Sequence, residues 1–226
     1  MNYISIAIDG PSGAGKSTLA RQAAAALGYL YVDTGAIYRT VALSAVRLGI
    51  DPGDAARLIP TLEQLDIRLE YDPGDGLQHM YLNGEDVTTQ IRLHEISQHA
   101  SRVSAIPEVR AFLLELQRDL ARKNNVIMDG RDIGTVVLPD ADVKIFLTAS
   151  AQARATRRHL ELQQRGQQTD FDTVLRDIIT RDEQDSNRPV APLRQAEDSV
   201  LLDTTELDLD QSLDALLTVI KKELAQ

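Results

Sequence analysis

A glycine-rich turn near the beginning of the chain constrains the fold more than any other feature. The apolar run at residues 4–8 is typical of a buried parallel strand. Residues 17–27 predict a helix that ends at Gly28, and residues 29–32 predict a second strand. This is one right-handed β–α–β unit, and a chain that starts with one is expected to build a parallel sheet covered by helices. The loop inside the unit reads Gly10-Pro11-Ser12-Gly13-Ala14-Gly15-Lys16-Ser17.

This loop matches the phosphate-binding pattern Gly-x-x-x-x-Gly-Lys-Ser/Thr, the P-loop. Its glycines allow successive backbone N–H groups to point at one anion, and the N-terminus of the following helix adds positive potential. Lys16 can reach the β- and γ-phosphates, and the Ser17 hydroxyl can ligate Mg²⁺. We therefore expect ATP as the bound nucleotide and Mg²⁺ as the cofactor. The expected ATP-binding run is Gly10, Pro11, Ser12, Gly13, Ala14, Gly15, Lys16, Ser17 and Thr18.

The pattern changes after the first unit and then returns. A helix is expected over residues 35–48. Strand-period alternation at residues 65–71, a turn at 72–76 and the hairpin signal Asn83-Gly84 then predict a small antiparallel sheet. Further helices are predicted at 107–122, 150–164, 171–185 and 210–224, and further strands at 125–128, 143–147 and 200–202.

Composition narrows the classes of function. The chain has 24 Lys and Arg against 34 Asp and Glu, a net charge of −10, which argues against a nucleic acid polymer as the partner. The absence of cysteine excludes disulfides, cysteine–zinc sites and thiol nucleophiles. The sequence has no run of 18 apolar residues and no signal peptide, so we expect a cytoplasmic protein without a membrane segment.

Three polar clusters are candidates for the second substrate. Two follow predicted strands, where open α/β sheets bind ligands: residues 33–39, with Arg39 one helical turn in, and residues 129–132. Asp129 reads either as a strand-end cap or as a partner of Mg²⁺. The third is the stretch 154–194, with eight arginines, no lysine and seven acids. Its arginines could grip phosphates bidentately, or they could form a solvated helix face.

Together these motifs resemble bacterial cytidylate kinase, and the resemblance covers essentially the whole chain. It implies transfer of the γ-phosphate of ATP to CMP or dCMP in pyrimidine nucleotide metabolism. It also implies the α/β P-loop nucleoside monophosphate kinase fold: a parallel sheet flanked by helices, a small antiparallel β insert and a helical lid. The motifs that carry it are residues 10–17, residues 33–39, residues 83–88, residues 129–137, and Arg181-Asp182 with Asn187-Arg188.

The resemblance implies one kinase domain over residues 1–226, working as a monomer. Its core would comprise residues 1–62, 100–149 and 195–226, with a monophosphate-binding insert at 63–99 and a lid at 150–194. A uridylate-preferring kinase and another P-loop small-molecule kinase, acting on a hydroxyl with Asp33 as base, remain open as alternatives. A P-loop switch protein is disfavoured, because no Asn-Lys-x-Asp string occurs.

Residue by residue, the resemblance assigns the acceptor site as well. Arg39, Arg131 and Arg188 would hold the acceptor phosphate. The cytosine ring would be read by Ser101, Arg110 and Asp132 with Thr34 nearby, and the sugar would be met by Arg181 and Asp185. Thr34 stands where the family motif usually has serine, which keeps the hydroxyl. The expected catalytic residues are Lys16, Arg131, Arg188 and Arg157, the last approaching the triphosphate from the lid; spacing alone does not separate Arg157 from Arg154 or Arg158.

We predict that Lys16→Ala lowers turnover by ~10²-fold or more but leaves CMP binding nearly unchanged, because this ammonium serves the phosphates of ATP. Steady-state rates and CMP affinity, measured on the same preparation, test this. A variant that retains full activity would remove the glycine-rich loop from the mechanism.

Overall fold

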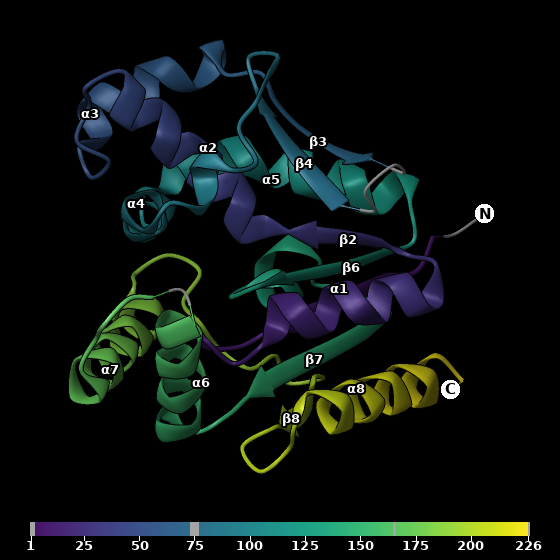
Figure 1. Ribbon diagram of the computed structural model, residues 1–226. Helices are drawn as coiled ribbons and strands as arrows, with labels where there is room; N and C mark the ends of the chain where they lie inside the picture. The colour runs from purple at the N-terminus through teal and green to yellow at the C-terminus, as the bar shows by residue number, and fades with distance from the viewer. Residues whose placement is uncertain (1–2, 73–76, 165, 226) are drawn as a thin grey trace. The chain divides into compact units, whose positions relative to one another are not determined.

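The computed structural model describes residues 3–72, 77–164 and 166–225 (Figure 1). The chain forms two compact units, one made of residues 1–31 with 124–226 and the other of residues 32–123. No helix within the described ranges combines the length and the apolar character that crossing a bilayer requires.

The first unit is built on a five-stranded sheet with the strand order β2-β6-β1-β7-β8. β1 pairs in parallel with both β6 and β7, and β7 pairs in parallel with β8. β2 carries the chain from the first unit into the second. The strands are β1 (Ser5–Asp9), β2 (Leu30–Asp33), β6 (Val126–Gly130), β7 (Val143–Thr148) and β8 (Val200–Asp203).

Strand register places the polar segments of this unit at one edge of the sheet. Asp9, the last residue of β1, lies opposite Gly130 of β6 and Phe146 of β7. Parallel strands end at the same edge, so the glycine-rich loop and the segment that begins at Arg131 both start there. The sequence pattern predicted this placement.

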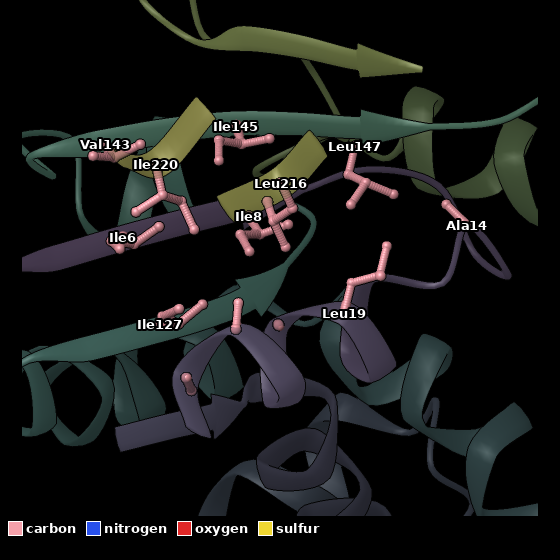
Figure 2. Close-up of a cluster of buried hydrophobic side chains, with 13 residues drawn as sticks. Ile6, Ile8, Ala14, Leu19, Ile127, Val143, Ile145, Leu147, Leu216 and Ile220 are labelled. Carbon is pink, nitrogen blue, oxygen red and sulfur yellow. The ribbon is translucent and has the colours of Figure 1, made fainter. Parts of the chain in front are cut away.

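The core of the first unit lies between one face of the sheet and two helices (Figure 2). Ile6 and Ile8 point to the same face because side chains alternate along a strand. Helix α1 (Lys16–Leu27) and helix α8 (Leu209–Leu224) both pack on that face, the latter through Leu216 and Ile220. The helix predicted at residues 210–224 is therefore confirmed.

Helices α6 (Ala151–Gln164) and α7 (Phe171–Asn187) pack against each other in the same unit. Each begins at a side-chain cap: Ser150 Oγ accepts a hydrogen bond from Ala153 N at 3.2 Å, and Asp170 Oδ2 accepts one from Thr173 N at 3.0 Å. Both helices were predicted. That residues 150–194 close as a lid stays a prediction, and Arg165 lies outside the described residues.

The second unit combines helices with a small antiparallel sheet of order β3-β4-β5. Its strands are β3 (Ile67–Asp72), β4 (Leu77–Leu82) and β5 (Glu85–Asp86). Asn83 and Gly84 have φ values of 51° and 85°, the left-handed pair that a two-residue hairpin of type I′ requires. The antiparallel sheet is confirmed, and the predicted turn falls largely on residues 73–76, outside the described part.

Around this sheet lie α2 (Thr34–Arg47) and α5 (Pro107–Lys123), which were predicted, and several shorter helices, which were not. Helix α4 begins after Leu93 without a side-chain cap, so the usual start signal is missing. The others are too short to show a helical period. In the second unit, sequence analysis missed α3 (Ala55–Leu58), the 3₁₀ segments Ile59–Gln64 and Gln90–Arg92, and α4 (His94–Ser104). In the first unit it missed a π-helical turn at Ile133–Val137.

We predict that Leu216→Ala lowers the free energy of unfolding by ~2–5 kcal/mol, because it removes a fully buried side chain between α8 and the sheet. Leu209→Ala is the control, since Leu209 belongs to the same helix but is about half exposed; its effect should stay within ~0.5 kcal/mol. Urea unfolding of the two variants measures both values, and equal losses would contradict the packing described.

Candidate active site

The glycine-rich loop leaves the sheet under tight steric control. A Cβ on Gly10 would lie 1.9 Å from the carbonyl oxygen of Leu147 in the neighbouring strand, so only glycine fits there. Gly13 and Gly15 have φ values of 76° and 89°, and Gly15 is the residue from which α1 begins. The loop therefore ends at a helix N-terminus whose backbone N–H groups are open to an anion.

Lys16 is held inside this loop. Its side chain is buried, and its Nζ donates a hydrogen bond to the carbonyl oxygen of Pro11 at 2.7 Å. Burial, followed by the positive charge of Arg131, lowers the pKa of Lys16 well below its usual value. A polyphosphate beside the ammonium would supply the negative charge that favours the protonated form.

Asp129, at the end of β6, links the loop to the sheet. Its Oδ2 accepts a hydrogen bond from Ser17 Oγ at 2.8 Å, and its Oδ1 accepts one from Tyr31 Oη at 3.0 Å. The carboxylate is buried. Asp129 is thus a hydrogen-bond partner of the Ser17 hydroxyl, and its role toward Mg²⁺ stays a prediction.

Asp9 is a buried carboxylate at the end of β1, only 5% exposed. It accepts two backbone hydrogen bonds, from Ile133 N at 2.8 Å and from Gly134 N at 2.7 Å. Burial raises the pKa of Asp9 to about 6, although the two N–H groups act in the opposite direction. Sequence analysis missed this residue, whose only signal is its position directly before the glycine-rich loop.

Two arginine–carboxylate pairs join the segment after β6 to α7 and the chain beyond it. Arg131 Nε lies 2.7 Å from Asp185 Oδ2, and Arg188 Nη2 lies 3.0 Å from Asp132 Oδ1. Burial acts to raise the pKa of Asp185, but Arg131 and then Arg181 and Arg188 hold it below its usual value. Five residues assigned to the CMP site, Arg131, Asp132, Arg181, Asp185 and Arg188, are therefore brought together in the first unit.

Arg154 connects the loop with α6 and α7. Its buried guanidinium donates to the carbonyl oxygens of Ala149 at 2.8 Å and Ser12 at 2.9 Å. It also forms a two-pronged ion pair with Asp182, at 3.0 and 2.6 Å. Sequence analysis placed this arginine on a helix face but did not identify its partners, because they come from distant parts of the chain.

The other two arginines of that helix face have different partners. Arg157 donates to the carbonyl oxygens of Thr204 at 2.5 Å and Leu207 at 3.3 Å, and Arg158 pairs with Glu161 at 2.8 Å. Of the three side chains, it is Arg154 that hydrogen-bonds to the glycine-rich loop. The catalytic role assigned to Arg157 stays a prediction.

The remaining predicted residues lie in the second unit. Asp33 caps α2 by accepting from Ala36 N at 2.9 Å, and its other oxygen lies 2.7 Å from Nη2 of Arg39. Thr34 is the first residue of this helix and is buried. An Asp33 carboxylate engaged in this way is a helix cap and an arginine partner, which gives no support to its use as a catalytic base.

Ser104, at the junction of α4 and α5, links Ser101 with Arg110. Arg110 donates to the carbonyl oxygen of Ser104 at 3.3 Å, and Ser104 Oγ donates to the carbonyl oxygen of Ser101 at 3.0 Å. The guanidinium carbon of Arg110 also lies 5.5 Å from the centre of the Tyr38 ring, within cation–π range. The second unit therefore positions Arg110 between two helices.

Comparisons with known proteins point to one family. The family model described as cytidylate kinase matches residues 6–222. The cytidylate kinase of Caldicellulosiruptor bescii is 48% identical over 222 residues, covering 98% of this chain and 97% of that protein. That of Syntrophotalea carbinolica is 50% identical over 215 residues, covering 95% and 91%.

A solved structure is similar at a lower level. The shikimate kinase of Bacteroides thetaiotaomicron shares 14% identity and a TM-score of 0.49 with this chain, with 99% of each chain covered. A likeness of this degree carries no argument about the substrate.

We predict that the difference in unfolding free energy between the wild type and Asp9→Asn falls as pH rises. The carboxyl has a pKa of 3.8 as its ordinary value and about 6 in the folded protein. The folded state binds the proton of Asp9 more tightly than the unfolded state does. Protonation of Asp9 therefore stabilises the folded protein fully below pH ~3.8, and this contribution is lost as pH rises through ~6. A shift of this size corresponds to ~3 kcal/mol. Urea unfolding across this range measures the difference, and a rise with pH would contradict the assignment.

Proposed function

The chain belongs to the cytidylate kinase family, and on that premise we propose that it transfers the γ-phosphate of ATP to CMP or dCMP, giving ADP and CDP or dCDP. The family resemblance read from the motifs is confirmed by these relatives, and the alternatives are not favoured. One structural observation carries the mechanism: the phosphate loop and the segment that holds Arg131 and Asp132 leave one edge of the sheet, and two part-buried arginine–carboxylate pairs lie in the same unit.

The acceptor in this reaction needs no catalytic base. A phosphate monoester carries about −1.5 to −2 charges at pH 7, so its oxygen is already a nucleophile. The difficulty is to bring two polyanions together, and fixed cations offset their repulsion. We assign this role to Lys16 on the ATP side and to Arg131 and Arg188 on the CMP side, with Arg39 as a further phosphate partner. A site rich in arginine and without a dedicated base suits this chemistry.

The two ion pairs suggest how CMP is accommodated. Arg131 and Arg188 are each held by a carboxylate, Asp185 and Asp132 respectively. We propose that the acceptor phosphate takes over these guanidinium groups, which releases the carboxylates to accept hydrogen bonds from the sugar and the base. The charge of each arginine is then offset in both states, and no cation is left buried without a partner.

The residues around Ser17 fit a magnesium ion. Mg²⁺ prefers oxygen ligands and is usually bound by one or two protein groups together with substrate phosphates. The Ser17 hydroxyl and the Asp129 carboxylate supply such oxygens, and Tyr31 fixes the orientation of Asp129. We propose that Ser17 ligates the ion directly and that Asp129 supports it. When bound, the ion neutralises charge on the β- and γ-phosphates.

Base selection follows from hydrogen-bond polarity. Cytosine offers an amino group at N4, which a carboxylate accepts, whereas uracil presents a carbonyl oxygen there. We propose that Asp132 reads this position and that Arg110 and Ser101 meet the acceptors N3 and O2. Thr34 would lie near the base, and Arg181 with Asp185 would contact the sugar. In the cell we propose a cytoplasmic enzyme of pyrimidine nucleotide metabolism, because its proposed substrates are free nucleotides. We also propose a monomer, as the family resemblance implies.

The proposal is tested by ADP formation from ATP and Mg²⁺ with CMP, dCMP, UMP, AMP, GMP, dTMP and shikimate as acceptors. CMP or dCMP should give the highest kcat/KM. A higher value for UMP would identify a uridylate-preferring kinase, and a higher value for shikimate a kinase that acts on a hydroxyl group.

We predict that Asp132→Asn narrows the ratio of kcat/KM for CMP to that for UMP by roughly 5- to 150-fold, mainly by lowering the CMP value. An asparagine can donate as well as accept, and a mispaired buried hydrogen bond costs ~1–3 kcal/mol. Steady-state rates with both nucleotides measure the ratio.

Asp185→Asn is the matched control for that ratio, because Asp185 also faces an arginine but is assigned to the sugar. It should weaken both nucleotides and leave their ratio almost unchanged. If only Asp185→Asn shifts the ratio, the two carboxylate assignments are reversed; if neither does, Arg110 or Ser101 selects the base.

A further inference from the structure

We infer that Asp9 is a positioning residue that holds the acceptor-binding segment, residues 131–137, against the beginning of the phosphate loop. The inference rests on the proposed function, because it takes Arg131 and Asp132 as partners of the acceptor. Asp9 itself is assigned no contact with either nucleotide.

The carboxylate of Asp9 caps a wound turn. It accepts from the N–H groups of Ile133 and Gly134, at 2.8 and 2.7 Å. The turn continues through bonds to the carbonyl oxygen of Asp132 from Val136 N at 2.9 Å and Val137 N at 3.2 Å. This is π-helical winding, an uncommon local form that often occurs at functional sites. The turn starts directly after Asp132, so its capping sets where Asp132 and Arg131 lie.

The surroundings of Asp9 are also closely packed. Asp9 is peptide-bonded to Gly10, whose backbone lies too close to the Leu147 carbonyl for any side chain to fit. A Cβ built on Gly134 would lie 3.5 Å from Asp9 Oδ2 and 3.3 Å from the stem of Lys144. Lys144 is in turn fixed by Asp198 at 2.6 Å. The Asp9 carboxylate, Gly134 and the stem of Lys144 are therefore close neighbours.

A buried carboxylate at this position lowers stability, which suggests that Asp9 has a role other than stabilising the fold. Burying an ionised carboxyl group is unfavourable, and in Asp9 it outweighs the two hydrogen bonds in setting the pKa. A carboxylate, however, offers acceptor oxygens to two neighbouring N–H groups at once, whereas asparagine would turn its NH₂ group toward one of them. The two acceptor oxygens of Asp9 therefore position the turn, even though burying the carboxylate is unfavourable for folding.

Asp142 provides a control because it contacts Ser5, the first residue of β1, whereas Asp9 is the last residue of that strand. Its Oδ2 accepts from Ser5 N at 2.7 Å and from Ser5 Oγ at 3.0 Å, so it too is a carboxylate that holds a backbone N–H of the sheet. It is exposed and lies at the edge away from the phosphate loop. Asp142→Asn should therefore leave the kcat/KM for each nucleotide within about 2-fold of the wild type.

The experiment compares Asp9→Asn with Asp142→Asn at pH ~7.5, with three readouts: kcat/KM for CMP, the CMP/UMP ratio and the Kd of ATP. We expect Asp9→Asn to lower kcat/KM for CMP by ~10- to 100-fold and to narrow the CMP/UMP ratio, because a small displacement of Arg131 and Asp132 disturbs both phosphate and base binding. The Kd of ATP should change by less than about 3-fold, since Gly10 and α1 still fix the loop. If the Asp9 cap served stability alone, the folded variant would keep the wild-type kcat/KM for CMP, CMP/UMP ratio and Kd of ATP.

Asp9→Glu keeps a carboxylate but moves it by one methylene group, so it perturbs the same two hydrogen bonds and serves if Asp9→Asn does not fold. It should produce the same pattern in weaker form. The inference is overturned if the folded variants keep CMP kinetics and the CMP/UMP ratio within about 2-fold of the wild type, or if ATP affinity falls in parallel with CMP affinity. If the proposed function is wrong, the wild-type protein will prefer an acceptor other than CMP. The Asp9 variants are then compared with the wild type in the same way, by kcat/KM for that acceptor and by the Kd of ATP.

Discussion

The parallel register of β1 between β6 and β7 is the constraint on which the site depends. It brings Asp9 opposite Gly130 and Phe146, so three chain segments leave the sheet at one edge. The glycine-rich loop can then pass directly beside the Leu147 carbonyl, which excludes every residue but glycine at position 10. The hydrophobic packing of α1 and α8 on one face of these strands fixes the register, because a slip of one residue would turn Ile6 and Ile8 away from the helices.

Electrostatic balance is the second theme of the site. Four cationic side chains of the first unit each have an oxygen partner: Lys16 at the Pro11 carbonyl, Arg131 at Asp185, Arg188 at Asp132 and Arg154 at Asp182. Burial, and then the neighbouring Arg131, lower the pKa of Lys16, while Asp129, Asp9 and Asp185 act in the opposite direction. Bound phosphates would add negative charge beside Lys16 and favour its protonated form.

The sequence was informative where local chemistry decides the structure. The glycine-rich loop, the Asn83-Gly84 hairpin and the capped helices α6 and α7 were predicted because turn and cap residues act on their neighbours. The uncapped start of α4, the π-helical turn and the partners of Asp9 and Arg154 were not predictable in this way. Asp9 and Ile133 are 124 positions apart and Arg154 and Ser12 are 142 apart, so only the folded sheet brings them together. The residues assigned to CMP stand on family resemblance, and their grouping into two units came from the structure.

The central claim is that the donor and acceptor phosphates meet in one site and that the γ-phosphate passes directly between them. Binding of a bisubstrate compound, in which adenosine and cytidine are joined through their 5′ positions by a chain of five phosphates, tests this most directly. We expect the compound to compete with both ATP and CMP and to bind more tightly than either alone, because the two phosphate-binding regions are occupied by one molecule. Competition with ATP only, with CMP still able to bind, would contradict the claim.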